Sequence, residues 1–99
     1  MPLSPGLPED AEDISLRGFN KSVGPLYSLP DDGGPPRLGF VVAEKHMNAA
    51  GTVHGGMLMA LADVSMGRTS RLIAEAEIGS TVALSCDFLA PGRLGDLIE

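Results

Sequence analysis

The segment Asn48-Ala49-Ala50-Gly51-Thr52-Val53-His54-Gly55-Gly56-Met57-Leu58-Met59-Ala60-Leu61-Ala62-Asp63 joins a polar, glycine-rich loop to an apolar stretch. The apolar stretch predicts a helix from about Gly55 to about Arg71, whose apolar side chains point in almost every helical direction. A helix of this kind is typically surrounded by protein instead of lying on a surface. We therefore expect it to be the central element of the fold.

The beginning of this helix and its single carboxylate suggest a chemistry. Gly55 and Gly56 leave the N–H groups of the first turn open to an electron-rich ligand atom. Asp63 follows eight residues after Gly55, roughly 12 Å along the axis and within about 80° of the same face. Oxyanion donors and a proton-accepting carboxylate are the two parts needed to hydrolyse an activated ester. Two structural readings stay open: Asp63 lies on a solvated edge or pairs with Arg68, and the glycines admit another strand.

The other polar candidates have equally plain structural readings. His54 caps the helix or bonds to backbone, and Asn48 either caps a turn or acts at the site. His46 and His54 lie eight residues apart with no cysteine or second acid at ligand spacing, so no metal site is expected. Cys86 is the single cysteine, which excludes an internal disulfide, and its place in a strand pattern predicts a buried, unreactive thiol.

The rest of the chain predicts a small α+β domain. Residues 1–13, rich in proline and acid, are expected to form a flexible N-terminal segment, and residues 14–99 the domain. The expected elements are a short helix within 14–21, a strand at 24–29, a turn at 30–36, a strand at 37–45, a strand at 81–89 and the opening of another strand at 97–99. The strands at 24–29 and 37–45 should form a hairpin.

Composition limits the possible functions. The chain has 99 residues, 43% of them hydrophobic, which is enough for one domain with a core. With a net charge of −6 and no basic cluster, nucleic-acid binding is not expected. No apolar run approaches the roughly 20 residues of a membrane span, and the acidic start is unlike a signal peptide, so we expect no membrane partner and a cytoplasmic location. No Gly-x-Ser-x-Gly motif is present, which disfavours a serine hydrolase.

Two motifs resemble those of a known family. They are His46-x-Asn48-x-x-Gly51-Thr52-Val53-His54-Gly55-Gly56 with the following Leu61-Ala62-Asp63, and Leu84-Ser85-Cys86-Asp87-Phe88-Leu89-Ala90-Pro91. Residues from about 18 to 99 resemble the hotdog-fold acyl-CoA thioesterases, in the PaaI-like branch related to 4-hydroxybenzoyl-CoA thioesterases. The resemblance implies an antiparallel sheet wrapped around one long central helix, incomplete at the C-terminus, in a homodimer or homotetramer.

The resemblance also implies roles for individual residues. The backbone N–H of Gly55 would polarise the thioester carbonyl with help from Asn48, and Asp63 from the opposite subunit would activate water or attack directly. Supporting roles would fall to His54, Gly56 and Thr81. The substrate would be an acyl-CoA with an acyl group that the sequence leaves open, and no cofactor is expected.

Two other functions stay open beside thioester hydrolysis. The chain could be a non-catalytic acyl-CoA-binding or dimerisation module, or an inactive fragment of a hotdog enzyme. A hotdog dehydratase is disfavoured by the spacing of Asn48 and Asp63.

Overall fold

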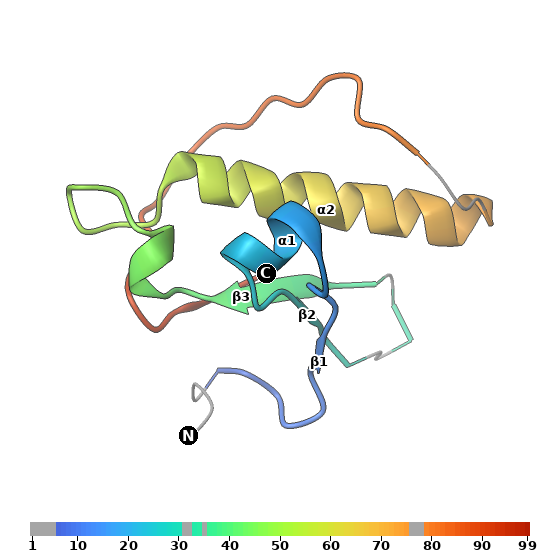
Figure 1. Cartoon of the computed structure of the whole chain (residues 1–99), viewed down its shortest axis with the longest axis horizontal. Coiled ribbons are helices and arrows are strands. Elements are labelled where there is room, and N and C mark those ends of the chain that lie inside the picture. The colour runs from blue at the N-terminus through green and yellow to red at the C-terminus, as the bar shows by residue number, and fades with distance from the viewer. Residues whose placement is uncertain (1–5, 31–32, 35, 76–78) are drawn as a thin grey trace.

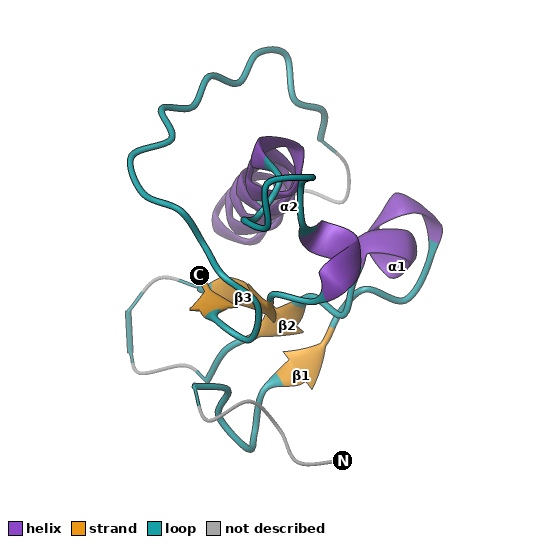
Figure 2. Cartoon of the chain, turned by 90° about the vertical axis from the view of Figure 1, so that its left-hand side faces the viewer, coloured by secondary structure: helices purple, strands orange, loops and turns teal. Residues whose placement is uncertain are grey.

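The structure, a computed structural model, describes residues 6–30, 33–34, 36–75 and 79–99. One long helix, α2, lies across a small sheet, and the short helix α1 lies beside both (Figures 1 and 2). In chain order the elements are β1 (Glu12–Asp13), α1 (Gly18–Val23), β2 (Tyr27–Ser28), β3 (Leu38–Val41), the 3-10 turn η1 (Glu44–His46), α2 (Gly55–Ala74) and β4 (Leu97–Ile98).

The described strands form an antiparallel sheet in the order β1-β2-β3-β4. The pairing of Tyr27 with Gly39 joins β2 to β3, which confirms the predicted hairpin. Phe40 pairs with Ile98, so the strand predicted to open at residue 97 is also confirmed. Part of the predicted turn, at residues 31–32 and 35, lies outside the described residues.

The core lies between β3 and α2. Leu38, Phe40 and Val42 alternate with neighbours on the other face of β3 and are all buried, as their spacing predicts. They pack with Met57 and Leu61 from the first two turns of α2. Burial of these apolar side chains therefore fixes α2, and the loop before it, against the sheet.

Phe40→Ala tests this arrangement of the core. The Phe40 side chain is fully buried, so its truncation should lower the free energy of unfolding by about 3–5 kcal/mol. Phe19→Ala is the matched control, because the Phe19 side chain is 65% exposed and its removal should change stability by less than about 0.5 kcal/mol. Chemical denaturation measures both, and equal effects would contradict the core described here.

Helix α2 begins at Gly55 as predicted but ends at Ala74, one turn beyond the expected Arg71. Glu75 ends it in the left-handed conformation, with φ of 54°, and its N–H bonds to the Arg71 carbonyl. The expectation that protein surrounds the helix is wrong for this chain. The sheet covers one side only, and Met66, Leu72 and Ile73 are 47, 54 and 75% exposed.

The predicted strand at 81–89 is also wrong, because residues 79–89 are described as loop. They pass along the side of α2 away from the sheet (Figures 1 and 2), where no described strand can share backbone hydrogen bonds with them. Val82 is 99% exposed as a result. Cys86 is exposed too, so the buried thiol expected from the strand pattern is not found.

The first helix begins later than predicted, at Gly18 instead of residue 14. Ser15 explains the delay, since its buried hydroxyl accepts the Leu26 N–H at 3.1 Å and its N–H donates to Asp13 Oδ1 at 2.8 Å. These bonds hold the chain extended beside β2. Glu12 and Asp13, at the end of the segment expected to be flexible, form β1, and the domain boundary at residue 13 stays a prediction.

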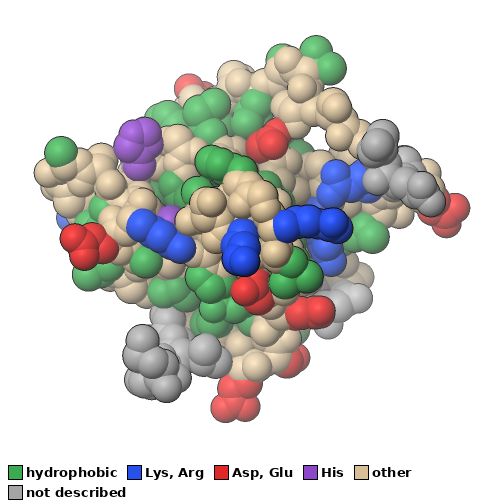
Figure 3. Space-filling model, viewed as in Figure 1, with side chains coloured by type: hydrophobic (Ala, Val, Ile, Leu, Met, Phe, Trp, Pro, Cys, Tyr) green, Lys and Arg blue, Asp and Glu red, His purple; other side chains and the backbone are tan. Residues whose placement is uncertain are grey.

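Charge is unevenly distributed over the surface despite the net charge of −6. Figure 3 shows Lys and Arg side chains gathered across the face that carries α1. In the part of the chain that the structure describes, no helix is both long and apolar enough to cross a membrane.

Candidate functional site

Buried hydrogen bonds of His46 anchor the loop that leads into α2. The ring is 2% exposed and meets Phe40 edge-on, with centroids 4.8 Å apart. Its Nδ1 accepts the Ala43 N–H at 2.9 Å, so Nε2 carries the proton and donates to the Val23 carbonyl at 2.5 Å. The His46 carbonyl in turn accepts the His54 N–H at 2.8 Å. His46 therefore positions the start of α2 through its ring and its backbone.

Asn48 closes the next turn of this loop. Its Oδ1 accepts the N–H groups of Ala50 and Thr52 at 3.0 and 3.1 Å, and its Nδ2 donates to Thr52 Oγ1 at 3.0 Å. Gly51 has a φ of 85°, a conformation that glycine adopts readily. These bonds match the capping role left open for Asn48, and one of its two amide hydrogens has no assigned acceptor among the described residues.

The first turn of α2 leaves one backbone donor available. His54 is the N-cap, and its Nδ1 accepts the Gly56 N–H at 2.8 Å. The Met57 N–H bonds to the His54 carbonyl at 2.9 Å. No group in the described residues accepts the Gly55 N–H, although the first N–H groups of a helix need acceptors. Gly55 can therefore offer this donor to a ligand, whereas the Gly56 N–H is occupied.

A pocket of about 370 Å³ lies in front of this turn. Asn48, Thr52 and Gly55 line it together with residues 88–92. The Phe88 ring lies so close that a Cβ at Gly55 would be 3.0 Å from Phe88 Cζ, a tight contact that the ring must relieve by shifting slightly. This contact of Phe88 could not be found from the sequence, because no local pattern links residues 33 positions apart.

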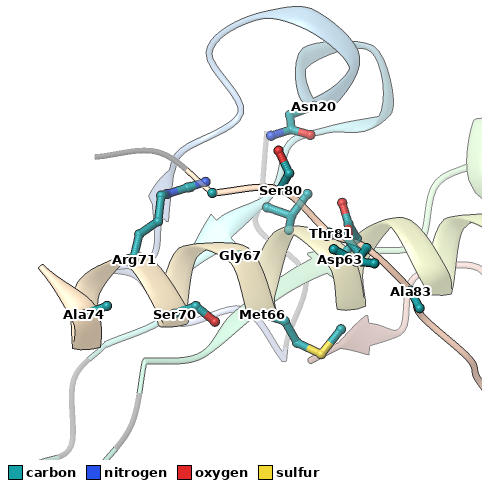
Figure 4. A pocket seen from close by; sticks show the side chains of 13 residues that line it. Asn20, Asp63, Met66, Gly67, Ser70, Arg71, Ala74, Ser80, Thr81 and Ala83 are labelled. Atoms are coloured by element: carbon teal, nitrogen blue, oxygen red, sulfur yellow. The ribbon is translucent and has the colours of Figure 1, made fainter. Parts of the chain in front are cut away.

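Asp63 lies in a second, larger pocket of about 790 Å³ (Figure 4). Thr81 Oγ1 donates a hydrogen bond to Asp63 Oδ1, which joins α2 to the loop that follows it. Asp63 as a whole residue is half-buried, and this hydrogen bond is exposed to solvent. Arg68 lines a different pocket, so the structure does not support the reading in which Arg68 pairs with Asp63.

The structure thus places the predicted residues in two groups. Asn48 and Gly55 share the smaller pocket, and Asp63 and Thr81 share the larger one. Gly55 and Asp63 are eight positions apart on α2, about 12 Å along the axis. A single chain does not bring the oxyanion donor and the carboxylate to one point.

The larger pocket also contains Arg71, which the sequence indicated only as the expected end of the helix. Arg71 lines the pocket, eight residues after Asp63, with Gly67 midway between them. Residues four apart share a helix face, so the spacing already indicates from the sequence that Arg71 lies on the same face of the helix as Asp63.

The described residues hold no group of three His, Cys, Asp or Glu side chains suited to a metal ion.

Comparisons with known proteins give the family. A family model described as Thioesterase superfamily matches residues 50–99, which include Gly55, Asp63 and Thr81. A Pseudomonas aeruginosa protein named "Putative esterase PA0474" is 36% identical over 78 residues, covering 78% of this chain and 58% of that protein. A Caenorhabditis elegans protein named "Putative esterase F42H10.6" is 34% identical over 81 residues, covering 82% of this chain and 48% of that protein.

The chain thus spans about half the length of these curated relatives. The matched half includes the whole of α2 and the loop that carries Thr81. The long helix lying on an antiparallel sheet agrees with an incomplete hotdog fold of the predicted α+β class. From the family match and this architecture together, the chain belongs to the thioesterase superfamily.

Proposed function

We propose that this chain is part of an acyl-CoA thioesterase, which hydrolyses the thioester of an acyl-CoA to a free acid and CoA. The observation that carries the proposal is the layout of α2. Its first N–H, at Gly55, has no acceptor among the described residues, and its carboxylate, Asp63, is held by the Thr81 hydroxyl. The family match and the esterase names of both relatives support hydrolysis. The acyl-CoA substrate rests on the resemblance of the two motifs.

The proposed site is composite and forms between two copies of the chain. Gly55 and Asp63 lie in separate pockets of one chain, and a two-fold axis would bring Asp63 of a second copy to the pocket at Gly55. The exposed apolar side chains of Met66, Leu72 and Ile73 agree with a helix that is covered on assembly. We therefore propose a homodimer, or a homotetramer built from such dimers.

In the proposed reaction, the thioester oxygen accepts the Gly55 N–H, with Asn48 assisting. These donors stabilise the negative charge that develops on that oxygen. Asp63 takes a proton from water as the water oxygen bonds to the carbonyl carbon, and collapse of the intermediate breaks the C–S bond and releases CoA. Direct attack by the carboxylate, followed by hydrolysis of the resulting anhydride, uses the same residues. His54 and Gly56 shape the helix start, and no cofactor takes part.

The test is thiol release from a panel of acyl-CoAs, measured with purified protein whose oligomeric state is determined in parallel. Release of thiol by a dimer or tetramer is the expected result. Saturable binding of acyl-CoA without thiol release would instead favour the binding module considered above and would overturn the proposal.

Thr81 provides a finer test of how Asp63 is positioned. Thr81→Val removes the hydroxyl that donates to Asp63, so kcat should fall about 10-fold, the effect of losing a hydrogen bond to a charged group. Thr81→Ser keeps the hydroxyl and should retain most of the activity. Equal rates for the valine and serine variants would show that this bond does not contribute to turnover.

A further inference from the structure

The larger pocket has groups of opposite charge at its two ends. Asp63 and Thr81 lie at one end and Arg71 lies at the other, while Asn20 and Ser80 line the wall between them (Figure 4). Asn20 comes from α1, Arg71 from α2 and Ser80 from the following loop, so three segments of the chain line this pocket. A guanidinium, an amide and a hydroxyl are all donors to an anionic oxygen group.

The Arg71 side chain points back along α2 toward Asp63. A Cβ built at Gly67 would lie 3.8 Å from Arg71 Nη1, which places the guanidinium beside a residue one turn before Arg71. Helical side chains normally lean toward the N-terminus in this way. Gly67 follows Asp63 by four residues, so the cation lies at a level about 6 Å from Asp63 along the helix axis.

The guanidinium has no carboxylate partner within the part of the chain that the structure describes. The ion pair found there joins Arg37 to Glu99, at 3.2 Å, and neither of these residues lines this pocket. Arg71 is nevertheless half-buried, and Figure 3 shows further Lys and Arg side chains on the same face as α1. A positive region of this kind attracts anionic ligands into a cleft.

We propose that Arg71 binds an anionic group at the far end of the acyl chain, so that the preferred substrates are CoA esters of short dicarboxylic acids. This inference rests on the proposed function and names its substrate class. The carbonyl lies toward Asp63, and the distal carboxylate lies about one helical turn away at Arg71. The phosphates of CoA are the other anionic groups of such a substrate, but the long pantetheine arm separates them from the thioester by much more than one turn.

The experiment compares glutaryl-CoA with pentanoyl-CoA, two esters of equal chain length that differ in the terminal carboxylate. Wild-type protein should show the higher kcat/KM for glutaryl-CoA. In Arg71→Gln the ratio of the two kcat/KM values should fall about 10- to 100-fold, mainly through KM, as expected for loss of a charge-assisted bond. Arg68→Gln is the matched control, because Arg68 is a half-buried cation of the same helix that lines another pocket, and it should leave the ratio unchanged.

Two outcomes would overturn the inference alone. If Arg71→Gln slows hydrolysis of both CoA esters by the same factor and leaves the matching pantetheine esters unaffected, the anion held by Arg71 is a CoA phosphate. If wild-type protein hydrolyses both esters equally well and Arg71→Gln leaves their ratio unchanged, Arg71 holds no anion of the acyl group. Thioester hydrolysis stands in either case.

A binding measurement separates the inference from the proposed function. The probes are the non-hydrolysable thioethers S-(4-carboxybutyl)-CoA and S-pentyl-CoA, titrated into wild-type protein and Arg71→Gln. Tighter binding of the carboxy thioether by wild-type protein, lost in Arg71→Gln, supports the anion site even if no ester is hydrolysed. In that event the proposed hydrolysis is wrong, while the anion site at Arg71 is supported. Equal binding of both thioethers by wild-type protein would overturn the anion site.

Discussion

Asp63→Asn should lower kcat for thiol release by about 10²- to 10⁴-fold, the usual contribution of a positioned general base. The amide cannot accept a proton from water, but its oxygen can still accept the hydrogen bond from Thr81. The variant should therefore keep the fold and the orientation of the side chain while losing turnover. Steady-state kinetics with a panel of acyl-CoAs measures the effect, and circular dichroism checks the fold.

Asp10→Asn is the control for this substitution. Asp10 is an exposed carboxylate that lines neither pocket, so the same loss of charge there should leave kcat unchanged. Turnover by Asp63→Asn at the wild-type rate would rule out the role assigned to Asp63 in either form of the mechanism, whether the carboxylate activates water or attacks the carbonyl itself.

Gly55→Pro should be nearly as damaging, because it removes the backbone N–H proposed to hold the thioester oxygen. Loss of one oxyanion donor typically lowers kcat by about 10²- to 10³-fold. Proline is well tolerated at the first position of a helix, and the extended conformation of His54, with φ −64° and ψ 132°, suits the residue before a proline. The helix should therefore form in the variant.

Gly55→Ala separates the lost donor from the added side chain. Alanine keeps the N–H but places a Cβ 3.0 Å from Phe88 Cζ, so the ring must move by a few tenths of an ångström. We expect a small loss of activity in Gly55→Ala and a loss at least tenfold greater in Gly55→Pro. If the two variants lose activity to the same extent, the effect comes from contact with Phe88 and the backbone donor is not used.

The same two inactive variants test the composite site. If Asp63 of one copy serves Gly55 of another, a hybrid dimer of Asp63→Asn and Gly55→Pro chains contains one site in which both residues are native. Co-expression should then restore about a quarter of the wild-type activity, because about half of two-fold dimers are hybrids and half of their sites are intact. A site formed within a single chain would recover nothing.

Local sequence patterns were sufficient to predict the structure where neighbours in sequence are also neighbours in space. Alternation along residues 38–42 predicted the buried face of β3, and the two glycines predicted the start of α2 at Gly55. The prediction failed at residues 81–89, although their alternation is equally regular. A strand exists only where another strand accepts its hydrogen bonds, and the described part of this chain places none beside that segment.

The candidate site likewise combines features that the sequence determines with features that only the tertiary structure decides. The sequence by itself determined which residues we propose for the chemistry, since a helix start with an open N–H and a carboxylate eight positions later follow from helical geometry alone. Only the tertiary structure decided that Thr81 holds Asp63, that Phe88 covers Gly55, and that Arg71 shares a pocket with Asp63. These contacts depend on the path of the loop after α2, which packing fixes and no local pattern encodes.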